Sequence, residues 1–169
     1  MAIFCGIDPG KSGCLCVLTN STPTFFDWPK DDDIRTYFGE IAEYIEGVDI
    51  ELAILEKVHA MPKQGVTSMF NFGENLGMWK AFLVIMEIPH LIVPPQQWMK
   101  GLVTKSDGPD TKSAVKNVVT RMFPKAELHG PKGGYKDGRG DALLMSYYAK
   151  QLCLDKYRKV ERPLNILKR

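Results

Sequence analysis

The stretch AIFCGIDPGKSGCLCVLT, residues 2–19, decides the fold of this 169-residue chain. Residues 2–8 and 13–19 are apolar runs of strand length, and a short segment rich in proline, glycine and serine separates them. Apolar runs of this length on either side of such turn formers predict a β-hairpin. Residues 24–28 then predict a third strand.

Outward from the hairpin, the apolar residues change from strand runs to helical spacing and back. In chain order we expect a helix at 34–45, a strand at 52–55 that ends at Glu56, a helix at 67–86, a strand at 90–93, a short helix near 97, a helix at 110–122, an irregular loop at 124–140 and a helix at 141–153. This order predicts an α/β fold with a mixed five-stranded sheet flanked by helices. We expect one domain at 1–153 and a basic C-terminal tail at 154–169.

The composition excludes several classes of protein. Hydrophobic residues make up 44% of the chain and charged residues 25%, which is typical of a globular domain and argues against disorder or a fibrous repeat. No basic stretch leads into a long apolar run, so we expect no membrane association and a cytoplasmic location. We expect the four cysteines to be reduced core thiols, because they include no C-x-x-C pair.

The segment GIDPGKS is similar to a phosphate-binding P-loop but does not satisfy its spacing. A P-loop has four residues between its first glycine and the Gly-Lys pair, whereas Gly6 and Gly10 enclose three. The residues after Ser12 also predict no helix. We therefore expect no nucleotide cofactor.

Charge is divided unevenly along the chain. Residues 1–98 contain 6 basic and 13 acidic side chains, whereas residues 99–169 contain 16 and 7. A basic half of this kind suits a polyanionic partner such as nucleic acid, although a solvated basic surface has the same composition.

Three acids interrupt apolar patterns where a core is expected. Asp8 ends the first strand, Glu56 ends the fourth, and Asp141 shares the apolar face of the last helix. Buried carboxylates without compensation are costly, and hard divalent cations with oxygen ligands neutralise them. Mg²⁺ fits this set, with two ions per site for the hydrolysis of a phosphodiester. The alternative is that each acid caps an element or pairs with a nearby lysine.

Two further side chains are candidate ligands of the same ions. Asp137 precedes Asp141 by four residues, although it lies in the glycine-rich segment that predicts a loop. His129 is a weaker candidate, because a lone histidine in a loop is usually solvated.

With these acids placed, the sequence resembles the RuvC-type Holliday-junction resolvases, most closely their compact bacteriophage branch. The resemblance covers residues 3 to about 150 and rests on GIDPGKSG, ILEKVHAMPKQGVTSMFNFGENLG and DGRGDALL. It implies a ribonuclease-H-like nuclease domain, a homodimer, and Mg²⁺- or Mn²⁺-dependent nicking of four-way DNA junctions in a bacterial cell or a virus-infected bacterial host. Asp8, Glu56 and Asp141 match the metal-binding acids of the family.

The chain departs from the family at two positions. Family members commonly have an acid or a histidine three residues before the last aspartate, where this chain has Gly138, so Asp137 is the expected substitute. The loop after Glu56 presents an aromatic wedge in the family, and the matching residue here is His59. Met61 and Phe70 are alternative wedges.

Several residues are expected to contact DNA. Gln64 and Ser68 lie where a loop and a helix N-terminus meet a phosphate. Lys100 and Lys112 match basic positions of the family, and Lys112 is expected to approach the scissile phosphate. The basic half adds Lys105, Lys116, Arg121, Lys132, Lys136 and Arg139.

The resulting hypothesis is a crossover-junction endonuclease that leaves 5′-phosphate and 3′-hydroxyl ends. A two-fold enzyme suits a substrate with two equivalent strands, and apolar residues on more than one face of the helix at 67–86 suggest the interface. These residues are Met69, Phe72, Leu76, Met78, Trp79 and Leu83. The alternatives are a flap or RNA–DNA hybrid nuclease on the same fold and a non-catalytic module that binds branched DNA.

Overall fold

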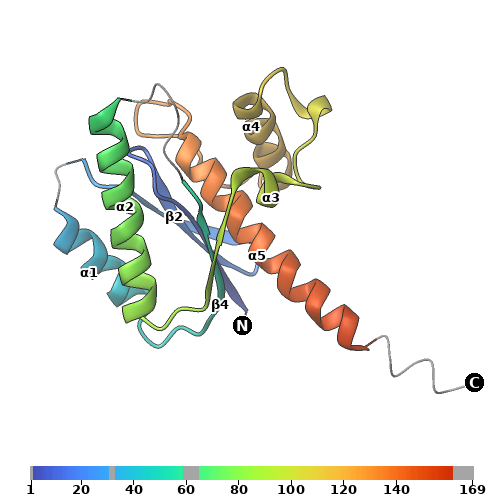
Figure 1. Ribbon diagram of the computed structural model, residues 1–169. Helices are drawn as coiled ribbons and strands as arrows, with labels where there is room; N and C mark the ends of the chain where they lie inside the picture. Colours follow the sequence, from blue (N-terminus) through green and yellow to red (C-terminus); the bar gives the residue numbers. More distant parts are fainter. Residues whose placement is uncertain (1, 31–32, 59–64, 162–169) are drawn as a thin grey trace, which may run out of the picture.

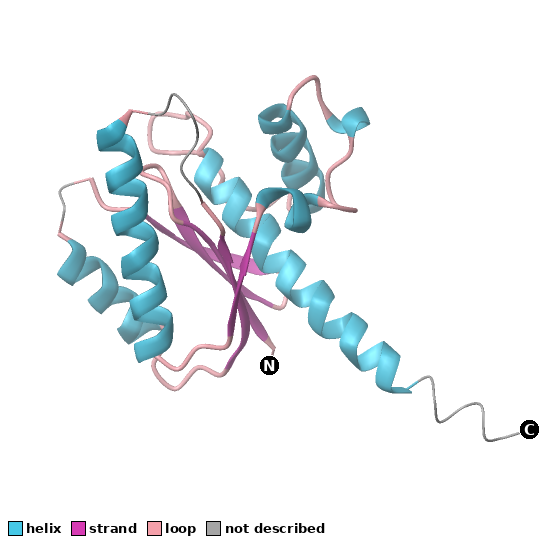
Figure 2. Cartoon of the chain, viewed as in Figure 1, coloured by secondary structure: helices cyan, strands magenta, loops and turns pink. Residues whose placement is uncertain are grey.

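A five-stranded mixed sheet forms the centre of the protein (Figures 1 and 2). The computed structural model describes residues 2–30, 33–58 and 65–161. The strands are β1 Ile3–Asp8, β2 Cys14–Thr19, β3 Thr22–Asp27, β4 Ile50–Glu56 and β5 His90–Val93. Their order across the sheet is β3-β2-β1-β4-β5. The β1–β2 and β2–β3 pairs are antiparallel, whereas β1–β4 and β4–β5 are parallel. The predicted fold class is confirmed.

Helices cover both faces of the sheet (Figure 1). They are α1 Ile34–Tyr44, α2 Val66–Ile85, α3 Pro95–Met99, the 3-10 helix η1 Lys105–Asp107, α4 Thr111–Met122 and α5 Asp137–Glu161. α1 and α2 pack on one face, and α3, α4 and α5 pack on the other. Within the described helices, none has the length and apolarity needed to cross a lipid bilayer.

The alternation of side chains along β2 divides the core into two layers. Cys14, Cys16 and Leu18 pack on the α5 face, whereas Leu15 and Val17 pack on the α2 face. Burial on both faces explains why this strand is a continuous apolar run. All four cysteines of the chain are free, and three of them are buried in this core, as expected.

The largest difference from the predicted elements is in α5. The helix begins at Asp137 rather than 141, so the end of the expected loop is helical, and it continues to Glu161 rather than ending at 153. Glycine disfavours helix, and the first turn contains both Gly138 and Gly140. Tertiary packing outweighs that preference, because each glycine lies against a neighbouring segment. The basic tail proposed for 154–169 therefore begins inside a helix.

The outer face of α2 also differs from the prediction. Trp79 and Leu83 are fully buried, and Leu76 and Met78 pack beside them in the core layer of α1 and α2. The large apolar side chains that α2 exposes are Val66, Phe70, Val84 and Ile85.

Candidate active site

Asp8 and Glu56 end two neighbouring parallel strands. β1 and β4 are in register through Ile7 and Leu55, so the next residue of each strand brings the two acids side by side at the carboxyl edge of the sheet. Neighbouring strands lie about 4.8 Å apart. Because side chains alternate, both acids lie on the same face as Gly6, which is the face that α5 covers.

Two glycines allow α5 to lie directly against β1 and the turn that follows it. A Cβ atom at Gly6 would lie 2.0 Å from the carbonyl oxygen of Ala142, and a Cβ atom at Gly138 would lie 2.2 Å from that of Ser12. Neither position can accept a side chain unless α5 moves. The acid or histidine that the family resemblance suggests at position 138 is therefore incompatible with this packing. The close approach brings the first turn of α5 over the ends of β1 and β4.

Asp141, one turn further along α5, shares one region with the acids of the sheet. Burial, together with the negative charges of Asp8, Glu56 and Asp137, raises the pKa of Asp141 well above its ordinary value. Burial and the charge of Asp8 raise the pKa of Glu56 to about 7. Burial also raises the pKa of Asp8, although a hydrogen bond from the Gly10 amide opposes the shift. The sequence prediction that these acids converge is consistent with this mutual repulsion.

The acids from the sheet have neutral hydrogen-bond donors rather than cations as partners. Asp8 Oδ1 accepts a hydrogen bond from the Gly10 N–H at 2.9 Å, and Glu56 Oε1 accepts one from Trp98 Nε1 at 3.1 Å. Among the described residues, no lysine or arginine forms an ion pair with Asp8, Glu56 or Asp141. The alternative in which each acid pairs with a lysine therefore has no support within the described residues.

This set of oxygen donors fits a hard divalent cation, because uncompensated carboxylates are the ligands that Mg²⁺ and Mn²⁺ prefer. In the part of the chain that the structure describes, no three Asp, Glu, His or Cys side chains lie at metal-ligand distance from a common point. The carboxylates must therefore reorient to share an ion. The residues that would hold it are Asp8, Glu56 and Asp141, with Asp137 as the fourth.

Asp137 lies one helical turn before Asp141 and not in a loop. Its Oδ2 atom is 3.0 Å from Lys112 Nζ, and both side chains are more than half exposed. The hydrogen bond and the charge of Asp137 raise the pKa of Lys112, so its ammonium group stays charged beside the acids. Lys112, in the first turn of α4, thus lies at the rim of the candidate site.

The other predicted DNA contacts are distributed over several elements. Lys100, Lys105, Lys116, Lys132 and Ser68 are exposed, and the Lys116 ammonium lies over the ring of Tyr135 at 5.0 Å. Phe70, one of the proposed wedges, is 70% exposed. His59, Met61 and Gln64 lie outside the described residues. His129, the weaker candidate ligand, pairs with Tyr135 in an isolated β-bridge.

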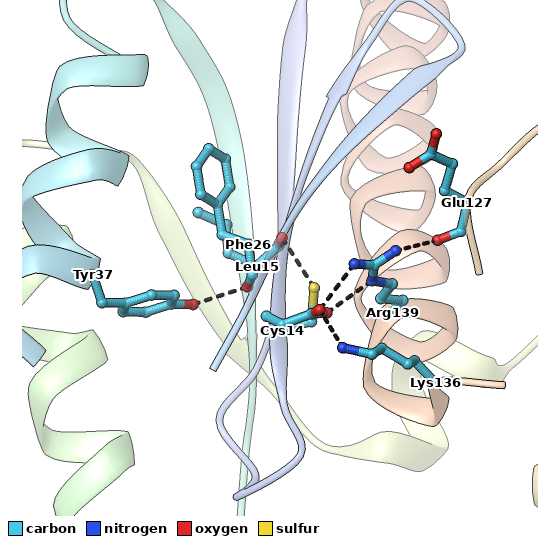
Figure 3. A network of polar contacts seen from close by, with 8 residues as sticks. Cys14, Leu15, Phe26, Tyr37, Glu127, Lys136 and Arg139 are labelled. Atoms are coloured by element: carbon cyan, nitrogen blue, oxygen red, sulfur yellow. Dashed lines mark hydrogen bonds and ion pairs between the residues drawn. The ribbon is translucent and has the colours of Figure 1, made fainter. Parts of the chain in front are cut away.

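Arg139, predicted on the DNA-binding surface, is instead engaged inside the protein. Its Nε is 2.8 Å from Asp27 Oδ1, its Nη2 is 2.9 Å from Asp27 Oδ2, and its side chain is 16% exposed. Lys136 binds the same carboxylate (Figure 3). We call Asp27, Lys136 and Arg139 the Asp27 clamp. It joins the end of β3 to the start of α5.

Asp27 is a residue that the sequence argument missed. It ends an apolar strand, as Glu56 does, so the same signal was present. The sequence predicts that this strand continues to Trp28, so Asp27 is not recognised as the residue that ends it.

Replacing Asp27 with asparagine is expected to destabilise the protein by about 2 kcal/mol, because two cations lose their shared carboxylate partner. Urea unfolding measures this cost. Lys136→Met completes a double-mutant cycle. If the clamp acts as a unit, the double variant loses less unfolding free energy than the sum of the losses in the two single variants. Strictly additive costs would contradict a shared network.

Raising the pH is expected to destabilise the metal-free protein. The folded pKa of Glu56, about 7, lies above its ordinary value of 4.5. Protonation therefore stabilises the fold fully below the ordinary value, and this contribution, on the order of 3 kcal/mol, is lost as the pH rises through about 7. The raised pKa values of Asp8 and Asp141 act in the same direction.

Thermal denaturation in a chelator at about pH 5 and about pH 8 tests this dependence. Glu56→Gln should flatten it, and Mn²⁺ should restore stability at the higher pH. An unfolding temperature that does not fall between the two pH values would contradict the repulsion among the acids.

The parallel and antiparallel strand pairs of this five-stranded sheet, with helices on both faces, define a ribonuclease-H-like α/β fold. Among solved structures, the chain is similar to T. thermophilus RuvC in complex with a Holliday junction substrate, with a TM-score of 0.60 and 16% identity over 88% of this chain and 92% of that chain. A second Thermus thermophilus RuvC structure matches with a TM-score of 0.57 and 17% identity, over 86% and 92% of the two chains. The chain therefore has a RuvC-type fold. No protein-family model and no curated protein sequence matches it.

Proposed function

We propose that the protein is a divalent-metal-dependent endonuclease that cuts branched DNA, above all four-way junctions. What supports the proposal is that β1, β4 and the start of α5, which carry Asp8, Glu56 and Asp141, meet at one end of one face of the sheet, and that none of the three acids has an ion-pair partner among the described residues. The similar RuvC chain was solved in complex with a Holliday junction substrate, which supports the same substrate class here.

In the proposed reaction, phosphodiester hydrolysis leaves 5′-phosphate and 3′-hydroxyl ends. Mg²⁺ or Mn²⁺ supplies Lewis-acid chemistry when bound, by making water more acidic and by neutralising charge on the phosphate. Asp8, Glu56 and Asp141 hold the ions, and Asp137 is the proposed fourth ligand. The Lys112 ammonium orients the scissile phosphate from the rim of the site.

The exposed cations of the basic half are proposed to hold the DNA backbone. Lys100, Lys105, Lys116 and Lys132 are exposed and belong to the segment in which basic residues outnumber acids. Such contacts supply affinity without reading base sequence. The Arg139 guanidinium already binds Asp27, which favours a structural role for that residue over a contact with DNA.

The decisive experiment compares three substrates: a synthetic immobile four-way junction, a flap and an RNA–DNA hybrid duplex. Each is incubated with the purified protein and Mg²⁺, Mn²⁺ or a chelator. Metal-dependent cleavage that is fastest on the junction supports the proposal. Faster cleavage of the flap or the hybrid would show that the protein is a nuclease for that substrate instead. Binding without cleavage in either metal would show that it is a non-catalytic module that binds branched DNA.

The proposed enzyme is a homodimer that joins through the outer face of α2. This face consists of residues at offsets 0, 4, 7, 11 and 18, which lie on one side of a helix. They are Val66, Phe70, Gly73, Gly77 and Val84. The three large side chains are more than half exposed, and a Cβ atom at either glycine would meet nothing within 4 Å. A flat apolar stripe of this kind allows a second helix to approach closely.

Val84→Glu is expected to convert the dimer to a monomer, because it puts a charge in the proposed interface. Light scattering after size exclusion measures the mass, and a supercoiled cruciform substrate distinguishes paired from unpaired nicks. Leu154→Glu, at an exposed apolar position on α5, is the matched control and should leave the dimer intact. A wild-type monomer that makes paired cuts would contradict this interface.

A further inference from the structure

A cavity of about 600 Å³ lies at the same end of the sheet as the acids but on the opposite face. Its lining residues come from the β1–β2 turn, the loop after β3, the start of α1 and one side of α2. β2 runs antiparallel to both β1 and β3, so the carboxyl ends of β1 and β3 share one edge. A DNA strand that crosses this edge can therefore reach both the acids and the cavity.

One wall of the cavity is apolar and firmly held. Trp28 lies edge-to-face against Tyr37, with ring centroids 5.3 Å apart, and against Phe38 at 6.2 Å. Trp79 supports it from the core, also at 6.2 Å. Met78 adds a polarisable side chain to the same lining. A fixed aromatic edge beside a thioether forms a suitable surface for a planar base.

The side of the cavity that α2 forms also presents amide groups. Asn75 lines the cavity, is 7% exposed, and makes no side-chain hydrogen bond with any other described residue. Asn71 lies one turn earlier on the same side of α2. A side-chain amide in the cavity lining can offer two donors and an acceptor to a ligand, and the edge of a nucleobase has complementary groups.

Two lysines and one glutamate are the charged residues of the described lining. Lys11 and Lys30 line the cavity and are exposed, and within the described residues neither forms an ion pair. Glu74 is the one carboxylate of the described lining and can accept a hydrogen bond from an exocyclic amino group. Lys11 is three residues beyond Asp8, so a phosphate bound there lies close to the proposed cleavage site.

We propose that this cavity receives one unpaired nucleotide of the branched DNA. The base lies against Trp28, the amides of Asn71 and Asn75 contact its polar edge, and its phosphate contacts Lys11 or Lys30. This inference rests on the proposed function, because a base at the branch point of a junction, where continuous stacking ends, unpairs at a lower cost than a base inside a duplex arm. It adds a second contact between protein and substrate, outside the catalytic acids.

The test is a double-mutant cycle in which dissociation constants are measured for protein variants with DNA variants. Divalent metal is left out so that no cleavage occurs. An abasic site is moved through each position near the branch point of a four-way junction. At one position it should weaken binding to the wild-type protein about tenfold. Asn75→Leu should bind the intact and abasic junctions equally, whereas the control Gln151→Leu should behave as wild type.

A second cycle does not depend on a buried substitution. Lys30→Gln, at an exposed position, is combined with a methylphosphonate that removes one phosphate charge next to the identified nucleotide. The two changes together should weaken binding no more than either change alone. If Asn75→Leu fails to fold, this second cycle alone tests whether the cavity binds the nucleotide.

The outcomes separate the two proposals. A protein that binds and cuts junctions but shows no coupling at any scanned position overturns the cavity inference alone. A protein that neither binds nor cuts junctions overturns both.

Discussion

Replacing Asp141 with asparagine is expected to lower metal-dependent cleavage by about 1,000-fold, equivalent to about 4 kcal/mol, while making the metal-free protein more stable. The two effects have one cause. The burial of Asp141, together with the negative charges of Asp8, Glu56 and Asp137, raises its pKa. Asparagine removes the repulsion, and it also removes the charge that would hold a divalent ion.

Two measurements on the same variant check this expectation. Cleavage of a four-way junction in Mg²⁺ reports the loss of activity, and thermal denaturation in a chelator at about pH 8 reports the gain in stability. Junction binding should persist, since no DNA contact is removed. Asp155→Asn, at an exposed position of the same helix, should change neither quantity. A variant that cuts at the wild-type rate would remove Asp141 from the catalytic site.

Gly6→Ala is expected to destabilise the fold by more than about 3 kcal/mol, the largest cost of any single methyl group that we predict. The new methyl carbon would lie 2.0 Å from the Ala142 carbonyl oxygen and 2.5 Å from the Ser146 amide nitrogen. Both are backbone atoms of α5 that cannot rotate away. The helix must therefore leave β1, and the contact between α5 and the sheet acids is lost with it.

The matched control is Gly39→Ala, the same substitution in the interior of α1. A Cβ atom at this position would meet nothing within 4 Å, so the change should stabilise the protein by up to about 1 kcal/mol. Urea unfolding of the two variants measures the difference. Equal stabilities would show that α5 does not depend on the close approach at Gly6.

The sequence was sufficient to predict the five strands and the order of the helices, because these features depend on local periodicity. An acid that ends an apolar strand, such as Asp8 or Glu56, is conspicuous against its neighbours. Parallel pairing of β1 with β4 then makes Asp8 and Glu56 neighbours. This adjacency follows from the order of strands in the sheet and does not depend on how individual side chains pack.

The sequence was insufficient where tertiary contacts decide the outcome. Gly138 and Gly140 predict a loop, yet they begin α5, since removing two side chains allows the helix to touch its neighbours. Arg139 was predicted to meet DNA because it belongs to a basic segment. Its partner, Asp27, is 112 positions away in the sequence, and no local pattern joins the two.

The length of α5, compared with that of the strands, indicates where a label can be attached. At about 1.5 Å per residue its 25 residues extend about 37 Å, whereas the six residues of β1 extend about 20 Å. The helix therefore projects past the sheet at the end remote from Asp141 (Figure 1). A label on these distal turns therefore lies far from the acids of the candidate site. That end of the helix is accordingly a suitable place to attach a fluorophore or an affinity tag.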